Sequence, residues 1–429
     1  MKPKTLDILL LNDFAHVNGG AAQVAISEAT GLAERGHRVS FLAAVGPVVS
    51  ELRASGVQVI LTEQFDIKSD PNRLRAATQG LWNPRAAGEL ANLLAGASPK
   101  TAIIHIHGWC KALSSSVIRQ AVSAGFRVVM TLHDYFYACP NGGFFNAPKR
   151  EICHLRPLSV ACLRENCDRD GYPQKLWRSL RQYVQNGPGT FPEIRHFITL
   201  SDFSENILRP FLPTEATLHR VPNPIEVEHK PPVEVGRNTR FLAVGRMSAE
   251  KGLSLLARAA ADVGSDVTFV GDGPCRDEIL AIYPKAEVTG WSPRQEVERQ
   301  FQQARALVFP SLWYEAQPLV VGEAAARGVP AIVPDQCAAR EWIVDGVTGL
   351  CFRSGDVSDL KEKMILLQDR ETAGRMGRAA YDRYWVDPHT RSRHITTLER
   401  CYESVLMDIL PRERRSITAH DHSEVPQSA

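Results

Sequence analysis

Residues 306–333 read ALVFPSLWYEAQPLVVGEAAARGVPAIV, and this stretch predicts a strand, a loop, a helix and a second strand. Its apolar runs at residues 306–309 and 331–333 are short and bounded by prolines, which indicates buried strands. Pro318 has no backbone N–H to satisfy, so it is well suited to open the helix between them. Two parallel strands joined by a helix are the repeating unit of an α/β sheet.

The same alternation of short apolar runs and helical stretches extends along the chain. The prolines between residues 222 and 232 cannot continue a helix or a central strand, so a linker is predicted at 223–238. We therefore predict two doubly wound α/β domains, at 1–222 and 239–410, the second with a last helix that could cross back to the first, and a disordered tail at 411–429. Strands are expected at residues 6–11, 38–43, 57–61, 103–107, 128–132, 196–200, 240–244 and 267–270, and helices at 22–35 and 115–124.

The composition is that of a globular protein. Of the 429 residues, 44% are hydrophobic and 23% are charged, and the net charge is +2, which argues against a dedicated nucleic-acid binder. Residues 1–230 carry 25 Lys and Arg against 20 Asp and Glu, a balance of +5 that suits an anionic surface and equally fits ordinary scatter. The first residues lack a small-residue cleavage site, and no apolar run reaches 18 residues, so we expect a cytoplasmic protein without a signal peptide or membrane span.

Charged residues follow the strands of the second series, where open α/β sheets bind ligands. Arg246 and Lys251 follow the strand at 240–244, and a guanidinium fork beside an ammonium suits a diphosphate. The first backbone N–H groups of the helix predicted after Pro318 would form an anion-binding site. Glu315 and Glu323, eight residues apart, would lie in the loop before this helix and within it.

These residues resemble the family 4 retaining glycosyltransferases, which have the GT-B fold of two Rossmann-like domains facing each other across a cleft. The resemblance spans nearly the whole chain. It is strongest in VGRMSAEKG (244–252), GDGP (271–274), FPSLWYEAQPLVVGEA (309–324) and RGVPAIV (327–333). It implies an acceptor domain at 1–222 and a nucleotide-sugar donor domain at 239–410.

The resemblance also implies roles for individual residues. Glu315 would contact the transferred sugar and Glu323 the nucleotide ribose, while His133, in the segment TLHD (131–134), would lie near the donor sugar. Many members have Gly-Phe-Gly after the first glutamate, whereas this chain has Ala-Gln-Pro at 316–318. The donor diphosphate would be bound by Arg246 and Lys251, by the backbone of Leu319 and Val320, and by the glycine loop of Gly19 and Gly20.

The implied activity is that of a hexosyltransferase. It would move a hexose from a nucleotide-diphosphate sugar to a hydroxyl of a glycan or lipid-linked acceptor in cell-surface polysaccharide synthesis, with retention of configuration. Retention of configuration is compatible with two mechanisms. One is a two-step reaction through a carboxylate nucleophile, and the other is a front-face attack by the acceptor. We expect no cofactor, and no Asp-x-Asp metal motif in the chain. A nucleotide-sugar epimerase of the same fold and a non-catalytic nucleotide-sugar binder are the alternatives; the binder would be expected to lose Glu315 or Lys251.

Two further features allow two interpretations each. Cys139, Cys153, Cys162 and Cys167 fall within 29 residues, and would either hold a structural metal or remain packed free thiols. Residues 174–184 repeat leucine and valine every four positions, as in a helix that lies on an anionic membrane at the inner face of the plasma membrane, or one that packs on its own domain. For His105 and His107, on the strand at 103–107, we expect structural roles.

Overall fold

The computed structural model describes residues 5–408, and the predicted tail at 411–429 lies outside them. The first lobe is built on a seven-stranded sheet with the order β3-β2-β1-β4-β5-β8-β9, in which every pairing is parallel. The strands are β1 (Asp7–Phe14), β2 (Arg38–Val45), β3 (Gln58–Leu61), β4 (Ala102–Ile106), β5 (Arg127–Thr131), β8 (His196–Thr199) and β9 (Thr217–Arg220).

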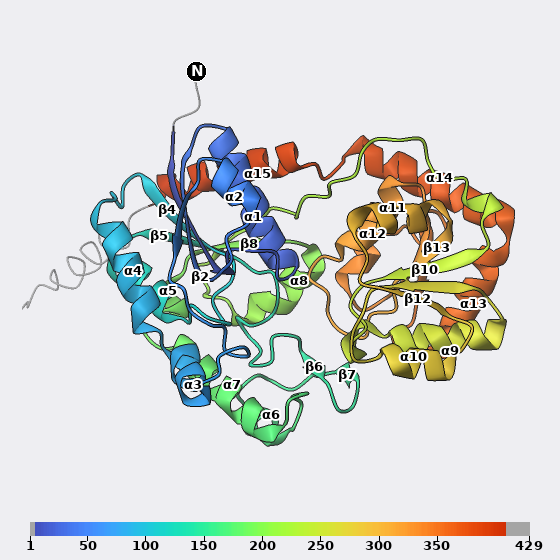
Figure 1. Ribbon diagram of the computed structural model, residues 1–429, viewed down its shortest axis with the longest axis horizontal. Helices are drawn as coiled ribbons and strands as arrows, with labels where there is room; N and C mark the ends of the chain where they lie inside the picture. The colour runs from blue at the N-terminus through green and yellow to red at the C-terminus, as the bar shows by residue number, and fades with distance from the viewer. Residues whose placement is uncertain (1–4, 409–429) are drawn as a thin grey trace, which may run out of the picture.

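Helices cover both faces of this sheet, and an excursion follows β5 (Figure 1). The excursion carries an antiparallel pair, β6 (Phe145–Asn146) and β7 (Glu151–Ile152), and reaches toward the second lobe. The helices of this part of the chain are α1 (Gly20–Glu34), α2 (Ser50–Ala54), α3 (Arg73–Leu81), α4 (Pro84–Ala95), α5 (Ser116–Ser123), α6 (Val160–Arg164), α7 (Tyr172–Gln185) and α8 (Asp202–Leu208).

The second lobe is built on a six-stranded parallel sheet with the order β12-β11-β10-β13-β14-β15. Its strands are β10 (Arg240–Val244), β11 (Val267–Val270), β12 (Glu287–Gly290), β13 (Ala304–Val308), β14 (Ala331–Pro334) and β15 (Gly349–Phe352). Its helices are α9 (Leu253–Val263), α10 (Arg276–Ile282), α11 (Arg294–Gln302), α12 (Leu319–Ala326), α13 (Val357–Gln368) and α14 (Arg370–Val386).

The central strands form because their residues are apolar on both faces, as a parallel sheet covered by helices requires. All five residues of β4, β5 and β13 are buried. The order of each sheet reverses direction beside its first strand, so the carboxyl ends of the strands open a crevice there. The predicted fold class, two Rossmann-like α/β lobes, is confirmed.

The last described helix, α15 (Arg391–Met407), belongs to the second half of the chain but packs against α1 of the first lobe (Figure 1). Ile395, Leu398 and Tyr402 enter the core formed by α1, β1 and β2. The lack of a side chain at Gly31 makes this close packing of α15 possible, because a Cβ there would lie only 2.9 Å from the Ile395 side chain. The chain thus passes between the lobes twice, once before β10 and once after α14.

Candidate active site

Lys251 and Glu315, predicted separately, are directly bonded at the carboxyl edge of the second sheet. Lys251 ends the short turn η4 (Ala249–Lys251) that follows β10, and Glu315 lies in the loop between β13 and α12. Lys251 Nζ lies 2.6 Å from Glu315 Oε1, which also accepts from Ser311 Oγ at 3.0 Å and Trp313 Nε1 at 2.6 Å. The Glu315 side chain is 11% exposed, so these three donors offset the cost of burying its charge.

Arg246 lies beside this pair and is 57% exposed, so its guanidinium is accessible to a ligand. It donates from Nη2 to Glu250 Oε1 at 2.9 Å, and Ser248 Oγ donates to the same oxygen at 2.7 Å. Burial opposes the charge on Glu250, but these partners hold its pKa below the usual value. An incoming anion would compete with Glu250 for Arg246.

Helix α12 begins directly after Pro318, as predicted, and presents its N-terminus at the same edge. The N–H groups of Leu319 and Val320 have no acceptor within the helix, because they belong to its first turn. Glu323 is half-buried in the middle of the helix, and burial raises its pKa. The helix thus offers two backbone donors at its start and one carboxylate a turn further on.

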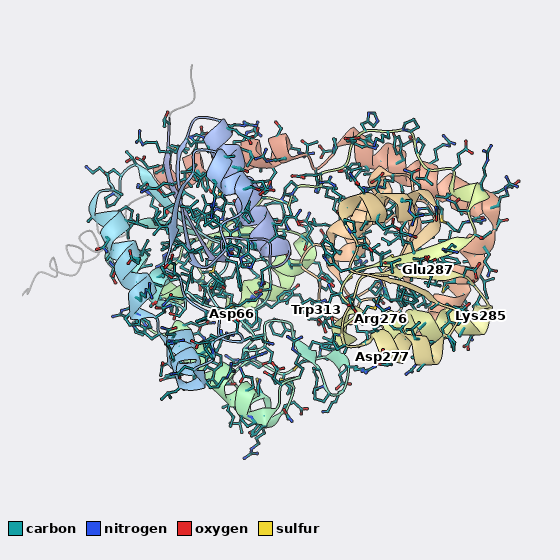
Figure 2. The ribbon with its side chains drawn as sticks, viewed as in Figure 1. Asp66, Arg276, Asp277, Lys285, Glu287 and Trp313 are labelled. Atoms are coloured by element: carbon teal, nitrogen blue, oxygen red, sulfur yellow. The ribbon has the colours of Figure 1, made fainter. Side chains whose placement is uncertain are left out.

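A pocket of about 500 Å³ lies between the lobes, and its lining residues include Arg246, Glu250 and Trp313 of the second lobe. Figure 2 shows Trp313 at the boundary of the two lobes and Asp66 on the first-lobe side, and both line this pocket. A second pocket, of about 510 Å³, lies at the linker and contains none of the predicted site residues. We therefore place the chemistry in the first pocket, whose charged lining residues include Lys68, Lys111, Asp134, Arg178, Arg246 and Glu250.

The predicted glycine loop is exposed and lies at the start of α1. Gly19 precedes the helix with φ +152°, and Gly20 is its first residue. The adjacent Asn18 lines the interlobe pocket. The glycines of GDGP (271–274) instead permit contact between backbones: a Cβ on Gly271 would lie 2.1 Å from the carbonyl oxygen of Gly245. Their close approach therefore serves the packing of this edge.

His133 follows β5 and contacts His107, which directly follows the neighbouring strand β4. Its Nε2 lies 2.9 Å from His107 Nδ1, and burial lowers the pKa of His133 to about 3. His107 in turn faces Glu28, a fully buried carboxylate on α1 that also meets His105 and His394. His105 and His107 are buried, so they help to organise the first lobe.

Four residues of these two clusters were not predicted from the sequence: Glu28, His394, Glu250 and Trp313. Glu28 left a signal that could have been used, because it stands on the helix face of Ala25, Ala29 and Leu32, all of which are buried. A carboxylate on an apolar stripe needs a partner. The partner on α15 could not be found from spacing, because His394 is 366 residues away in the sequence.

The four clustered cysteines are free thiols in this structure, and three of them are buried. Cys162 Sγ accepts from the buried amine of Lys175 at 3.3 Å, and Cys167 Sγ accepts from Asn141 at 3.1 Å. Within residues 5–408, the one grouping whose three potential metal-ligand atoms lie within 4.8 Å of one another is Glu28, His105 and His107.

The expectation about Asp-x-Asp motifs needs a correction. Asp168 and Asp170 do form such a pair in the sequence. Arg178 binds both carboxylates, at 3.1 Å each, and Lys68 lies 3.4 Å from Asp170. These carboxylates are therefore engaged with cations of the first lobe.

Helix α7 packs on the first lobe by its polar face and leaves its apolar face exposed. Its buried residues include Lys175 and Arg181, and Arg181 donates to the carbonyls of Cys110 and Pro140. Leu176 and Leu180 are 44% and 49% exposed. The repeat at 174–184 would place Arg181 on the polar, solvent-facing side of the helix; this expectation is wrong, and the exposed stripe is the apolar one.

Comparison with known families identifies the chain. Residues 18–229 match the family described as Glycosyltransferase Family 4, and residues 238–370 match that described as Glycosyl transferases group 1. The chain belongs to the family 4 glycosyltransferases. Its GT-B architecture therefore agrees with both the sequence resemblance and the two sheets described above.

Individual relatives are more distant. The chain is 31% identical over 153 residues to the alpha-D-kanosaminyltransferase of Streptomyces kanamyceticus, covering 32% of this chain and 39% of that protein. It is 32% identical over 121 residues to the GDP-mannose-dependent alpha-mannosyltransferase of Corynebacterium glutamicum, covering 28% of each. The matches thus span well under half the length of these curated relatives.

Solved structures resemble nearly the whole chain in fold. HepE of Anabaena, in complex with UDP and glucose, superposes with a TM-score of 0.63 at 15% identity, covering 93% of this chain and all of that one. The lipopolysaccharide outer core galactosyltransferase WaaB superposes with a TM-score of 0.61 at 14% identity, covering 93% of this chain and 99% of that one. At these identities the likeness concerns the fold.

Proposed function

We propose that this glycosyltransferase moves a hexose from a nucleotide-diphosphate sugar to a hydroxyl of a glycan or lipid-linked acceptor, with retention of configuration. The observation that supports this proposal best is the Lys251–Glu315 pair, which lies with Arg246 and the N-terminus of α12 at the carboxyl edge of the second sheet. Arg246 and Trp313 of this edge line the interlobe pocket. This edge combines cations and backbone donors for a diphosphate with a carboxylate for a sugar. HepE, which shares the fold, has been solved with UDP and glucose.

The leaving diphosphate gains negative charge as the glycosidic bond breaks. Arg246, Lys251 and the free N–H groups at the start of α12 are positive groups already in place at this edge. Fixed donors of this kind stabilise a transition state without reorganising, and each is commonly worth about a hundredfold or more in rate. The proposed mechanism is therefore electrostatic and involves neither cofactor nor metal.

Glu315 is proposed to orient the donor sugar instead of attacking it. Its Oε1 already accepts from a lysine, an indole and a hydroxyl. A carboxylate oxygen that accepts three hydrogen bonds, one of them from an ammonium, is a weak nucleophile. We therefore favour front-face attack by the acceptor over a covalent intermediate on Glu315.

A lipid-linked acceptor is supported by the surface of α7. Tyr172, Leu176, Leu180 and Tyr183 follow one another at helical spacing and are all exposed. The neighbouring α6 adds exposed Val160 and Arg164. We propose that this face binds peripherally to an anionic membrane, where cell-surface polysaccharides are assembled on lipids. No helix within residues 5–408 is long and apolar enough to span a bilayer.

A donor screen tests the proposal. The full chain would be incubated with UDP- and GDP-linked hexoses, with and without oligosaccharide or lipid-linked acceptors, while release of UDP or GDP is followed. Acceptor-dependent release and a product of retained anomeric configuration are expected. Release of epimerised sugar without any acceptor, or no turnover of any donor, would contradict it. For the membrane contact, binding to anionic vesicles should fall when Leu176 and Leu180 are replaced by serine.

A further inference from the structure

Glu28 stands at the centre of a buried cluster that joins three parts of the chain. It projects from α1, and its carboxylate lies among His105 and His107 of the first sheet and His394 of α15. The Glu28 side chain is 2% exposed, as is expected only for a carboxylate with compensating partners. The three partner rings are each 3% exposed or less, so the cluster is shielded from solvent.

The protonation of His394 follows from its two partners. Its Nε2 lies 3.0 Å from Glu28 Oε1, and its Nδ1 lies 2.7 Å from the carbonyl oxygen of Pro222 at the start of the linker. A carbonyl and a carboxylate only accept hydrogen bonds, so both ring nitrogens of His394 must donate. Burial opposes this charge, but the bond to Glu28 and its negative charge raise the pKa of His394. Glu28 and His394 are therefore a buried ion pair.

The second oxygen of Glu28 faces His107. Glu28 Oε2 lies 3.2 Å from His107 Nε2, and neither atom has a well-aligned hydrogen-bond partner among residues 5–408. If His107 Nε2 lacked a hydrogen, two acceptors would face each other in a dry site, at a cost of about 1–3 kcal/mol. The arrangement that avoids this cost places the hydrogen on His107 Nε2 and a lone pair on its Nδ1.

The position of the hydrogen on His107 also determines the tautomer of His133. His107 Nδ1 lies 2.9 Å from His133 Nε2, so a lone pair on the former requires a hydrogen on the latter. His133 is neutral, because burial lowers its pKa to about 3, and its Nδ1 is left as an acceptor. Under the proposed function, that acceptor is the atom available to a hydroxyl of the donor sugar.

We propose that Glu28 is a positioning residue that sets the tautomers of His107 and His133, so that His133 accepts a hydrogen bond from the donor sugar. The same carboxylate pairs with His394, which is bonded to Pro222 directly before the linker, so Glu28 also ties α15 to this segment. The role of His133 in this inference rests on the proposed function. The tautomers themselves do not.

A metal ion at the same place is the competing interpretation. His105 argues against it, because its two ring nitrogens are already engaged, with Tyr402 Oη and Thr131 Oγ1, each at 2.7 Å. Glu28 and His107 alone would leave an ion with two protein ligands, fewer than structural or catalytic zinc sites use.

The test uses the full chain carrying ¹⁵N-labelled histidine, with ring signals assigned by His107→Gln and His133→Gln. In the wild type, Nε2 should carry the hydrogen in both rings. In Glu28→Gln, His394 loses its counter-charge and still donates from Nδ1 to Pro222, so its Nε2 accepts from the amide NH₂. The amide oxygen then faces His107, and both tautomers should remain as in the wild type. In Glu28→Leu, a hydrogen on His107 Nε2 would have no acceptor, so both tautomers should invert. In His394→Gln, which keeps the carboxylate, they should remain as in the wild type.

The kinetic readout separates positioning from folding. Glu28→Leu should lower kcat for transfer roughly 10–100-fold, as loss of supporting residues commonly does, with KM for the donor changed less than about threefold. Unchanged tautomers in Glu28→Leu, or a stoichiometric metal in the purified wild type, would overturn the proposal. Inverted tautomers in a chain that turns over no donor would instead refute the proposed function alone.

Discussion

Lys251 and Glu315 are 64 residues apart in the sequence, yet the amine of one lies 2.6 Å from the carboxylate of the other. Trp313 supports the pair from two sides, since its indole N–H donates to Glu315 and its ring lies 5.4 Å below the Lys251 amine. Figure 2 shows this tryptophan where the lobes meet. A residue proposed for the diphosphate and a residue proposed for the sugar are therefore one bonded unit.

Replacing either Lys251 or Glu315 by alanine is expected to remove most sugar transfer while leaving the fold intact. Each change deletes one charge of the pair, and the loss should be about 100-fold or more in kcat/KM. Steady-state kinetics and a thermal melt of each variant measure the two effects. Activity close to that of the wild type in either properly folded variant would show that the pair is structural.

Replacing Glu323 by glutamine should weaken donor binding more than catalysis. Glu323 is expected from the family resemblance to accept from ribose hydroxyls, and an amide accepts less strongly than a carboxylate. We expect KM for the donor to rise about 5–20-fold with kcat within about threefold. Asp277→Asn is the matched control, because Asp277 lies on α10 of the same lobe (Figure 2). Equal KM values in both variants would refute the ribose role.

Gly271→Ala should destabilise the second lobe. The new Cβ would lie 2.1 Å from the backbone oxygen of Gly245, and φ at this residue is +139°. We expect the free energy of unfolding to fall by about 2–4 kcal/mol, as for other changes that force two backbones apart. At Gly264, where φ is +70° and no atom lies within 4 Å of an added Cβ, the same change should cost about 1 kcal/mol. Chemical denaturation of both variants provides the comparison, and equal losses would contradict the packing argument.

Stability should fall on acidification partly because of His133. Burial holds its folded pKa at about 3, whereas an unfolded histidine titrates near 6.5. The stability it contributes is fully present above about pH 6.5 and is lost as pH falls toward 3, because only the unfolded chain takes up the proton. His133→Gln should show a smaller decline of unfolding free energy over this range. An identical decline would place the titration elsewhere.

The sequence predicted the central strands because they are apolar on both faces. β10 and β11 agree with their predicted bounds of 240–244 and 267–270. The three strands of the two large sheets that it missed, β9, β12 and β15, all lie at sheet edges, and it also missed the short pair β6 and β7. β9 and β12 are half-exposed and carry polar residues, and β15 begins with a glycine, so none of them gives a clear apolar run.

The candidate site was predictable where strand order alone brings residues together. Arg246, Lys251, Glu315 and the start of α12 each follow a strand, and parallel strands end at one edge. The Glu28–His394 pair could not be predicted, because a last helix that crosses back to the first lobe does not show which of its residues meets Glu28. The inverted orientation of α7 was also hidden, since its periodicity shows a stripe but not which side the lobe covers.

The most direct test of the central claim is calorimetric titration of the full chain with UDP and with GDP. If the edge formed by Arg246, Lys251 and α12 binds the donor diphosphate, at least one nucleotide should bind with 1:1 stoichiometry. Lys251→Ala should weaken that binding at least about tenfold, the equivalent of 1.4 kcal/mol, while Lys285→Ala, at the far end of the same lobe in Figure 2, should not. Binding of neither nucleotide, or equal affinity in the wild type and Lys251→Ala, would contradict it.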